Sequence, residues 1–270
     1  MSVRTKASWF ADRKEHATSP VLIGAAFALI CFCSDASAHF QTLIPSEDVA
    51  VEGGEVTLDL VFTHPMDRGP TMDMAKPRRF AVKRGKTVTD LTSRLEERTV
   101  DGKRAWRARD NIDAPGVSIY FVEPQAYWEP AEKKYIVQHA KVIVDAFASG
   151  EDWDAMAGLP VEIQPLTRPT GLWTGNIFSG IVRKSGKPVP GAEVEVEYLN
   201  DGSVKPPSPA FVTQVVKADS NGVFSYAIPR AGWWGFAALT EGDKPMKGPD
   251  GKPAPVEVGG VIWVKATDMK

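Results

Sequence analysis

Apolar and polar side chains alternate in the segment Glu55–His64. Val56, Leu58, Leu60 and Phe62 occupy every second position of this segment. A period of two is typical of a β-strand that turns one face to a core and the other to solvent. We therefore predict a half-buried strand here, with the imidazole at its end on the same side as the apolar residues.

Short apolar runs separated by turn residues predict further strands. Before residue 168 they are Arg79–Lys83, Thr87–Leu91, Arg104–Arg109, Val117–Glu123 and Tyr135–Phe147. After residue 168 they are Ile177–Arg183, Glu193–Tyr198, Phe211–Val216, Val223–Ile228, Gly235–Leu239 and Val261–Val264. Helix is the alternative for Tyr135–Phe147, because that run is long. We expect Asp219–Gly222 to close a hairpin, residues 124–130 to form an ordered loop and residues 241–255 to form a mobile one.

This pattern predicts an all-β protein with two β-sandwich domains. The turn-rich stretch Arg168–Gly171 is the natural connector between them. Residues 39–168 would form the first sandwich, and residues 169–270 an immunoglobulin-like second sandwich. The 23 glycines and 21 prolines of the 270-residue chain suit short strands and many turns.

Residues 1–38 have the pattern of a secretory signal peptide. Basic residues precede the short apolar run Val21–Cys33, and Ala36-Ser37-Ala38 provides a cleavage site of small residues. A retained membrane anchor is one alternative, although the run is short for a span. A lipoprotein anchored at Cys31 is another, although Ile30 stands where a small residue is needed. We predict export to the periplasm and cleavage after Ala38, which removes both cysteines of the chain.

Composition and motifs narrow the function classes. Charged residues make up 24% of the chain and the formal net charge is -2. These values exclude a highly charged disordered chain and give no basic footprint for nucleic acid. The sequence contains no P-loop, no dinucleotide-binding glycine fingerprint and no Gly-x-Ser-x-Gly motif. We therefore expect a protein that is not an enzyme and has no nucleic-acid partner.

The candidate chemistry lies with three histidines of the processed chain, His39, His64 and His139. Cleavage after Ala38 would make His39 the first residue, so that its α-amine and Nδ1 could chelate one metal ion. His64 ends a predicted strand at the rim of the first sandwich. We predict that all three ligate a transition metal. The alternatives are a chance residue at a cleavage site, a hydrogen-bonded rim histidine and a partly buried structural histidine, respectively.

Imidazole ligands suit Ni, Cu, Zn and Co, and a nitrogen-rich site suits ions that accept square-planar or tetragonal geometry. Met66, Met72 and Met74 closely follow the second histidine in sequence. Their thioethers are candidate ligands for a soft ion, although methionines more often fill gaps in a core. Tyr127 and Trp128 are candidates to flank the site.

Several segments, taken in order, resemble one known family. They are Ala38-His39-Phe40, Phe62-Thr63-His64-Pro65 with Met72-Asp73-Met74, Tyr120 to Pro130, Tyr135 to Lys141, Leu159 to Leu166, Gly186 to Ala192 and Asp219 to Gly222. Together they resemble the periplasmic component family of nickel and cobalt uptake systems. The resemblance covers nearly the whole processed chain, and its last two segments look like a carboxypeptidase-regulatory (prealbumin-like) sandwich.

The resemblance implies a periplasmic protein that captures Ni²⁺ or Co²⁺ and delivers it to components of a membrane transporter. On this basis His39, His64 and His139 carry over as metal ligands. Two rival functions stay open. One is a Cu²⁺ protein with an N-terminal histidine brace, either a chaperone or an oxygenase, and the other is a structural or adhesion module. No span is predicted beyond the signal segment, so we expect the processed chain not to be transmembrane itself.

Overall fold

The computed structural model describes residues 39–270, and the predicted signal peptide lies outside them. The strands before residue 168 are β1 (Phe40–Pro45), β2 (Val49–Ala50), β3 (Gly54–Thr63), β4 (Thr71–Met72), β5 (Arg79–Arg84), β6 (Thr87–Asp90), β7 (Glu96–Val100), β8 (Lys103–Ile112), β9 (Gly116–Glu123), β10 (Tyr127–Glu129), β11 (Lys134–Ala146) and β12 (Val161–Pro165). The later strands are β13 (Leu172–Trp173), β14 (Ile177–Lys184), β15 (Lys187–Pro188), β16 (Glu193–Tyr198), β17 (Gln214–Lys217), β18 (Val223–Ala227), β19 (Gly232–Glu241), β20 (Met246–Lys247), β21 (Pro253–Ala254) and β22 (Val256–Thr267). Two 3₁₀ turns, η1 (Thr92–Arg94) and η2 (Pro209–Phe211), complete the elements. The prediction of an all-β protein is confirmed.

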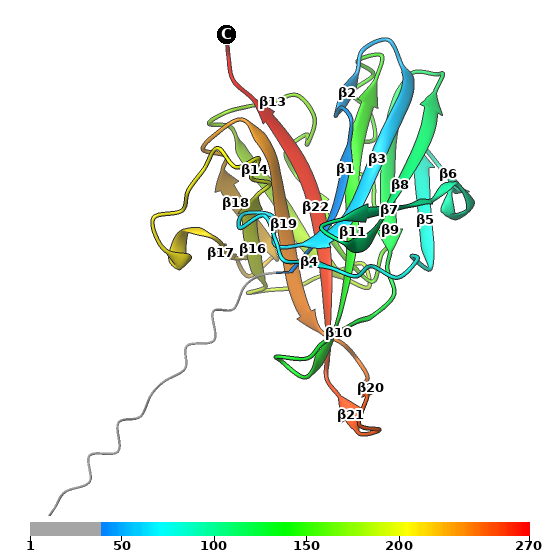
Figure 1. Ribbon diagram of the computed structural model, residues 1–270. Coiled ribbons are helices and arrows are strands. Elements are labelled where there is room, and N and C mark those ends of the chain that lie inside the picture. Colours follow the sequence, from blue (N-terminus) through cyan, green and yellow to red (C-terminus); the bar gives the residue numbers. More distant parts are fainter. Residues whose placement is uncertain (1–38) are drawn as a thin grey trace, which may run out of the picture. The chain divides into compact units, whose positions relative to one another are not determined.

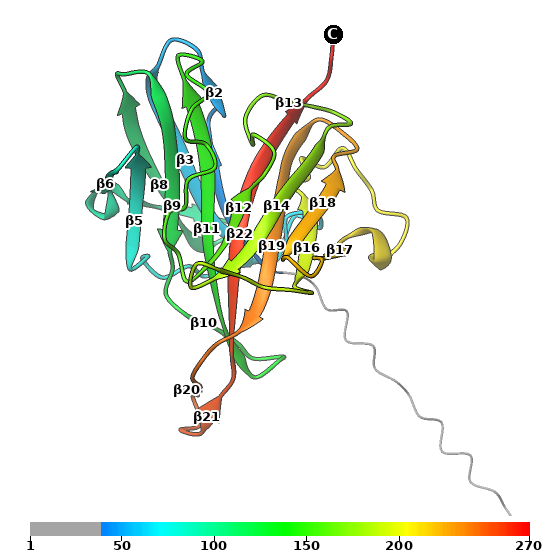
Figure 2. The same ribbon diagram turned by 180° about the vertical axis from the view of Figure 1, so that it is seen from behind.

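A large sheet with the strand order β17-β16-β19-β22-β11-β9-β5-β6 is the centre of the described fold. Figures 1 and 2 show β11 and β22 side by side within it, and they pair in parallel from Tyr135↔Val256 to Val142↔Trp263. Two smaller sheets accompany it, one built on β1-β3-β8-β7 and the other on β12-β14-β15 with β18. The hairpin β20–β21 forms a sheet of its own.

The two smaller sheets cover opposite faces of the large sheet. Along β22, Val261 and Trp263 enter one core, whereas Ile262 and Val264 enter the other. The first core is filled mainly from β1, β3, β8, β9 and β11, and the second mainly from β14, β16, β18 and β19. Since successive side chains of a strand point to opposite faces, one central strand serves both cores.

One sheet therefore contains strands from both sides of the predicted boundary at residues 168 and 169. The two cores correspond broadly to the two predicted halves, because each half supplies most of one core. The parallel pairing of β11 with β22 ties these halves together through backbone hydrogen bonds. The division into two domains stays a prediction. Within residues 39–270, no helix is long and apolar enough to cross a membrane.

The half-buried strand predicted at Glu55–His64 is confirmed as β3, whose apolar positions are buried alternately. The long run at residues 135–147 is a strand and not a helix, because it pairs with neighbours on both sides. The hairpin predicted at Asp219–Gly222 is wrong. The turn is present, with Gly222 at φ +77°, but it joins β17 to β18, which pair with strands of different sheets.

Three further local predictions differ from the structure. Residues 211–216 are not a single strand, because η2 occupies the first of them and β17 begins at Gln214. Residues 124–130 contain the short strand β10, which pairs with the start of β11. Residues 241–255 contain the paired strands β20 and β21. In each case the strands are short, and cross-strand pairing decides the structure where sequence periodicity is too brief to show it.

Candidate metal site

His39 and His64 lie beside each other, and β1 and β3 position them. Phe40, the first residue of β1, pairs with Thr63, the last residue of β3. The two histidines flank this pair, one preceding β1 and the other following β3. Their ring centroids lie 4.5 Å apart at an interplanar angle of 55°. Antiparallel pairing of these strands therefore brings together two histidines that the sequence separates.

This ring separation suits two imidazoles on one ion. With metal–nitrogen bonds of about 2.0–2.1 Å, an imidazole centre lies roughly 3 Å from the metal. Two imidazoles at right angles around the ion then lie roughly 4.5 Å apart, whereas opposed imidazoles lie roughly 6 Å apart. The observed 4.5 Å between His39 and His64 matches neighbouring positions in a coordination sphere.

Glu129, at the end of β10, completes the polar surroundings of His39. Its Oε2 lies 2.9 Å from His39 Nε2, and both side chains are largely buried, with 12% and 11% of their surface exposed. A carboxylate at Nε2 favours a proton on that nitrogen and leaves Nδ1 with its lone pair. Nδ1 is the nitrogen that can chelate together with the α-amine of the same residue.

His64 is buried, with 4% of its surface exposed. The pKa of His64 is lowered to about 4, mainly because the ring is buried and also because His39 lies beside it, while the Glu129 carboxylate opposes both effects. The imidazole is therefore neutral at physiological pH, which is the form that binds metals. This burial agrees with the prediction from strand parity that the side chain points to the core.

Aromatic rings and amides surround the pair. The rings of Phe62 and Tyr127 lie 5.6 and 6.2 Å from that of His39, centroid to centroid. The Gln138 side chain of β11 donates from Nε2 to the His39 carbonyl at 2.5 Å and accepts from the backbone N–H of Gln41 at 2.9 Å. A cavity of about 120 Å³ has Phe62, Tyr127 and Gln138 in its lining. Tyr127 thus flanks the pair, as its position in the sequence suggested.

His139 lies away from this pair. It follows Gln138 on β11, and successive strand residues face opposite sides of a sheet. Two residues further, Lys141 pairs with Glu162 of β12 at 2.7 Å, and both are buried on that opposite side. His139 pairs with Gly260 of β22. The structure therefore brings His39 and His64 together and does not bring His139 to them.

The environment of His139 is itself unusual. Its surface is 2% exposed, and among residues 39–270 no group meets either ring nitrogen in good hydrogen-bond geometry. Burial lowers the pKa of the imidazole, while the Glu123 carboxylate and a nearby backbone group of Gly259 oppose that shift. A neutral imidazole without a hydrogen-bond partner in a protein interior costs stability.

The methionines of the 66–74 run fill the cores. Met72 and Met74 belong to the first core and Met66 to the second. All three are buried, with 4–7% of their surface exposed. Met74 Sδ accepts a hydrogen bond from Gln41 Nε2 at 3.6 Å. Their placement fits the gap-filling alternative.

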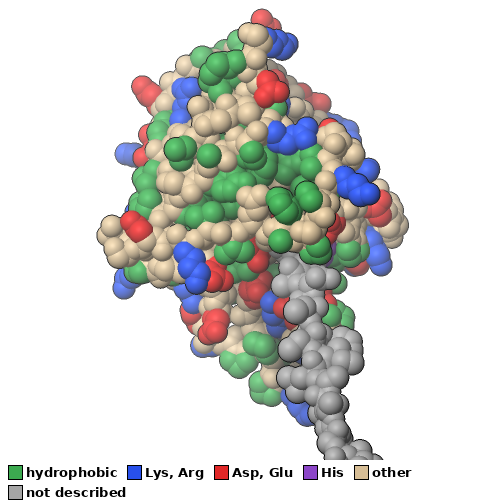
Figure 3. Space-filling view, turned by 90° about the vertical axis from the view of Figure 1, so that its left-hand side faces the viewer, with side chains coloured by type: hydrophobic (Ala, Val, Ile, Leu, Met, Phe, Trp, Pro, Cys, Tyr) green, Lys and Arg blue, Asp and Glu red, His purple; other side chains and the backbone are tan. Residues whose placement is uncertain are grey.

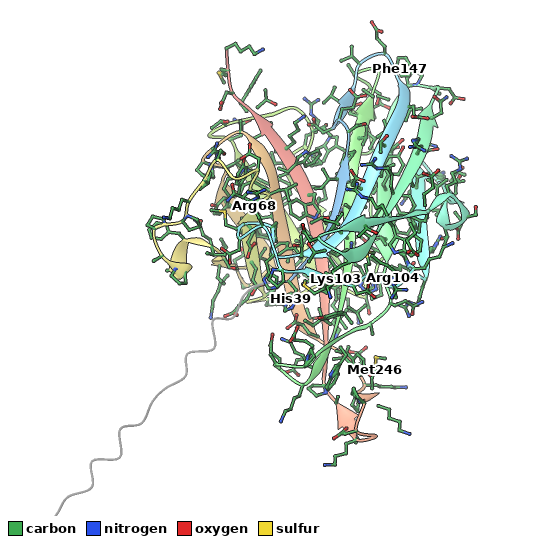
Figure 4. All side chains as sticks on the ribbon, in the orientation of Figure 1. His39, Arg68, Lys103, Arg104, Phe147 and Met246 are labelled. Carbon is green, nitrogen blue, oxygen red and sulfur yellow. The ribbon has the colours of Figure 1, made fainter. Side chains whose placement is uncertain are left out.

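Side chains alone do not build a complete metal site in residues 39–270. No group of three or more His, Cys, Asp or Glu side chains there has an arrangement that could hold an ion. A third nitrogen would have to be the α-amine released by cleavage after Ala38. Figure 4 shows His39 at the start of the described chain, with Arg68 of the loop between β3 and β4 higher in the view.

The sequence matches the model of one known protein family. The model of a domain of unknown function, DUF4198, matches residues 36–242. The chain belongs to the DUF4198 family. The matched range contains His39, His64, Glu129 and His139, and it ends just after β19. No curated protein matches this DUF4198 chain.

Solved structures resemble the DUF4198 chain only distantly. A titin fragment shares 8% identity at a TM-score of 0.21, covering 84% of this chain and 68% of its own. The adhesin InvE of Yersinia pseudotuberculosis shares 13% identity at 0.23, covering 82% and 58%. The major pilin subunit of Bacillus cereus shares 10% identity at 0.19, covering 86% and 68%. Likeness at this level carries no information on function.

Glu129 is the site residue that the sequence did not reveal. It stands 90 positions from His39, in a segment predicted to be a loop, and no periodic pattern surrounds it. Only the pairing of β10 with β11 brings its carboxylate to the histidine.

Proposed function

We propose that this protein is a periplasmic carrier of a transition metal, Ni²⁺ or Co²⁺, which captures the ion and delivers it to components of a membrane transporter. Three nitrogens hold the ion: the α-amine and Nδ1 of His39 and one imidazole nitrogen of His64. The observation that carries the proposal is the 4.5 Å separation of these two rings, which suits adjacent positions around one ion. The resemblance of the sequence to the nickel and cobalt uptake family supports the choice of ion and location.

Glu129 does not bind the ion itself but contacts one of the ligands, His39. It holds His39 through Nε2, so that Nδ1 faces the amine of the same residue. Carboxylates in this position orient a ligating imidazole and raise its basicity. His64 supplies a neutral imidazole without a large proton cost, because its pKa is low. The mechanism is ligand exchange, and no bond of the cargo is made or broken.

The copper alternative uses the same nitrogens. Divalent copper binds most nitrogen sites more tightly than nickel or cobalt does, so affinity alone cannot identify the physiological ion. Elemental analysis of protein exported to the periplasm and purified without added metal distinguishes the two. Bound nickel or cobalt supports the proposal, and bound copper alone supports the copper carrier.

Calorimetric titration with Ni²⁺ tests the ligand set. The exchanges His39→Ala and His64→Ala should each reduce affinity at least roughly 100-fold, because each removes a ligand. His139→Leu is the matched control and should bind as the wild type does. If no divalent transition ion binds the correctly processed wild type, the carrier function is wrong and a structural or adhesion module becomes the better account.

A further inference from the structure

The segment that follows His64 is fastened to the C-terminal strands of the chain. The backbone N–H of Met66 donates to Glu197 Oε2 of β16 at 3.1 Å. The Met66 carbonyl accepts from Asn200 Nδ2 at 2.9 Å. The Pro65 carbonyl accepts from the Asn200 backbone N–H at 3.2 Å. Three hydrogen bonds thus hold the two residues next to His64.

The side chain of Met66 strengthens this attachment. It is 7% exposed and belongs to the second core. The loop also closes on itself, because Gly69 N–H donates to the His64 carbonyl at 3.0 Å. The backbone that follows His64 is therefore held in three ways. Hydrogen bonds hold the peptide groups of Pro65 and Met66, the Met66 side chain packs in the second core, and the bond from Gly69 closes a turn.

The two fastening residues are themselves rigidly held. Glu197 is 1% exposed, and its Oε1 accepts from Thr213 Oγ1 at 2.5 Å. Asn200 accepts through Oδ1 from the N–H groups of Gly202 and Val204, at 3.0 and 3.2 Å. Its Nδ2 also donates to the Val204 carbonyl at 2.7 Å. Side chains that are fixed by their own hydrogen bonds restrict the movement of the backbone groups to which they bind.

We infer that Glu197 and Asn200 are positioning residues of the metal site, which hold His64 beside His39 although they belong to the C-terminal half of the chain. This inference rests on the proposed function, in which His39 and His64 bind a metal ion. The strand β3 fixes one side of His64, and these two residues fix the other. Loss of these hydrogen bonds should loosen the segment that follows β3 and let the imidazole of His64 shift relative to that of His39.

Four single variants of the processed protein test this. Glu197→Leu removes the acceptor for Met66 N–H, whereas Glu197→Gln keeps an acceptor oxygen in the same place. Asn200→Asp removes the donor to the Met66 and Val204 carbonyls. It keeps the acceptor for the N–H groups of Gly202 and Val204, which should preserve the local turn. Asn176→Ala is the control, since Asn176 Oδ1 accepts from Trp173 N–H in another turn of the same half.

Two readouts separate positioning from simple stability. The first, in metal-free protein, is the nuclear Overhauser contact between the ring protons of His39 and His64. It should be lost in Glu197→Leu and Asn200→Asp and kept in Glu197→Gln and Asn176→Ala. The second is Ni²⁺ affinity by calorimetry, which should fall roughly tenfold in the first two variants only.

The outcomes are distinct. If the folded Glu197→Leu and Asn200→Asp proteins keep both the ring contact and the affinity, the inference is overturned. If the wild type shows the ring contact but binds no metal, the carrier function fails while the positioning role is still measured by the contact. Should Glu197→Leu fail to fold, the milder Asn200→Asp exchange decides.

Discussion

The carboxylate of Glu129 lies 2.9 Å from Nε2 of His39, on the side of the ring away from Nδ1. This contact fixes the orientation of the His39 imidazole ring. A histidine that presents Nε2–H to a carboxylate offers Nδ1 to an ion. The same arrangement explains why a residue at the start of the described chain is held in place and largely buried.

Exchange of Glu129 should weaken metal binding without removing a ligand. We expect Glu129→Gln to reduce Ni²⁺ affinity roughly tenfold and Glu129→Ala to reduce it up to roughly 100-fold. Calorimetric titration measures both. Glu132→Gln is the matched control, because Glu132 pairs with Lys134 rather than with a histidine. Equal affinity in all four proteins would show that the carboxylate plays no part.

The pH dependence of stability reports on His64. The unfolded chain takes up this proton near pH 6.5, but the folded protein does so only near pH 4. The stability contributed by the neutral imidazole is therefore present above about pH 6.5 and is lost as the pH falls toward 4. Relative to His64→Gln, the wild type should lose roughly 1–3 kcal/mol over this window. Urea unfolding at several pH values measures the difference, and a constant difference would contradict it.

For Glu197 we expect the stability of the folded protein to depend on pH with the opposite sign. Burial raises its pKa to about 8, although hydrogen bonds from Thr213 and Met66 oppose the shift. The folded protein keeps this proton where the unfolded chain has lost it, so the associated stability is lost as the pH rises from about 4.5 to 8. Glu197→Gln should therefore gain roughly 2–4 kcal/mol relative to wild type across that range. Glu193→Gln, an exposed exchange on the same strand, should show no such gain.

His139 should be replaceable by an apolar residue. Its side chain is buried, and within the described residues 39–270 no group meets its ring nitrogens in good hydrogen-bond geometry. Removing an unsatisfied polar group from a core saves roughly 1–3 kcal/mol, part of which imperfect packing offsets. We expect His139→Leu to leave the melting temperature unchanged or to raise it by a few degrees. A clear loss of stability would reveal a partner for the imidazole.

Hydrophobic side chains gather on the face shown in Figure 3. Independently of that view, Ile177, Phe211 and Val215 of the C-terminal strands and loops are large apolar residues, each more than half exposed. Exposed apolar area on a β-protein favours association. Exchange of Phe211 for Ser should raise the protein concentration at which self-association is detected by light scattering and leave Ni²⁺ affinity unchanged.

The sequence predicts the strands where periodicity is long and misses what depends on tertiary pairing. Alternation at residues 55–64 locates β3 and the inward direction of His64 correctly. The same parity argument could not show that His139 faces away from the other histidines. The alternation of apolar and polar residues does not reveal which strands lie beside each other in a sheet. The β10 strand is three residues long, too short for any pattern, and so Glu129 was not predicted. The shared large sheet likewise depends on the pairing of β11 with β22, far apart in sequence.

The α-amine of His39 is the central element of this account, and one comparison measures it directly. Ni²⁺ is titrated calorimetrically into the chain that begins at His39 and into a chain that keeps Ala38, in which the amine becomes an amide. We predict 1:1 binding by the first and at least roughly tenfold weaker binding by the second, because the amide nitrogen is a poor ligand. Equal affinity of the two chains, or no binding by the first, would contradict the account.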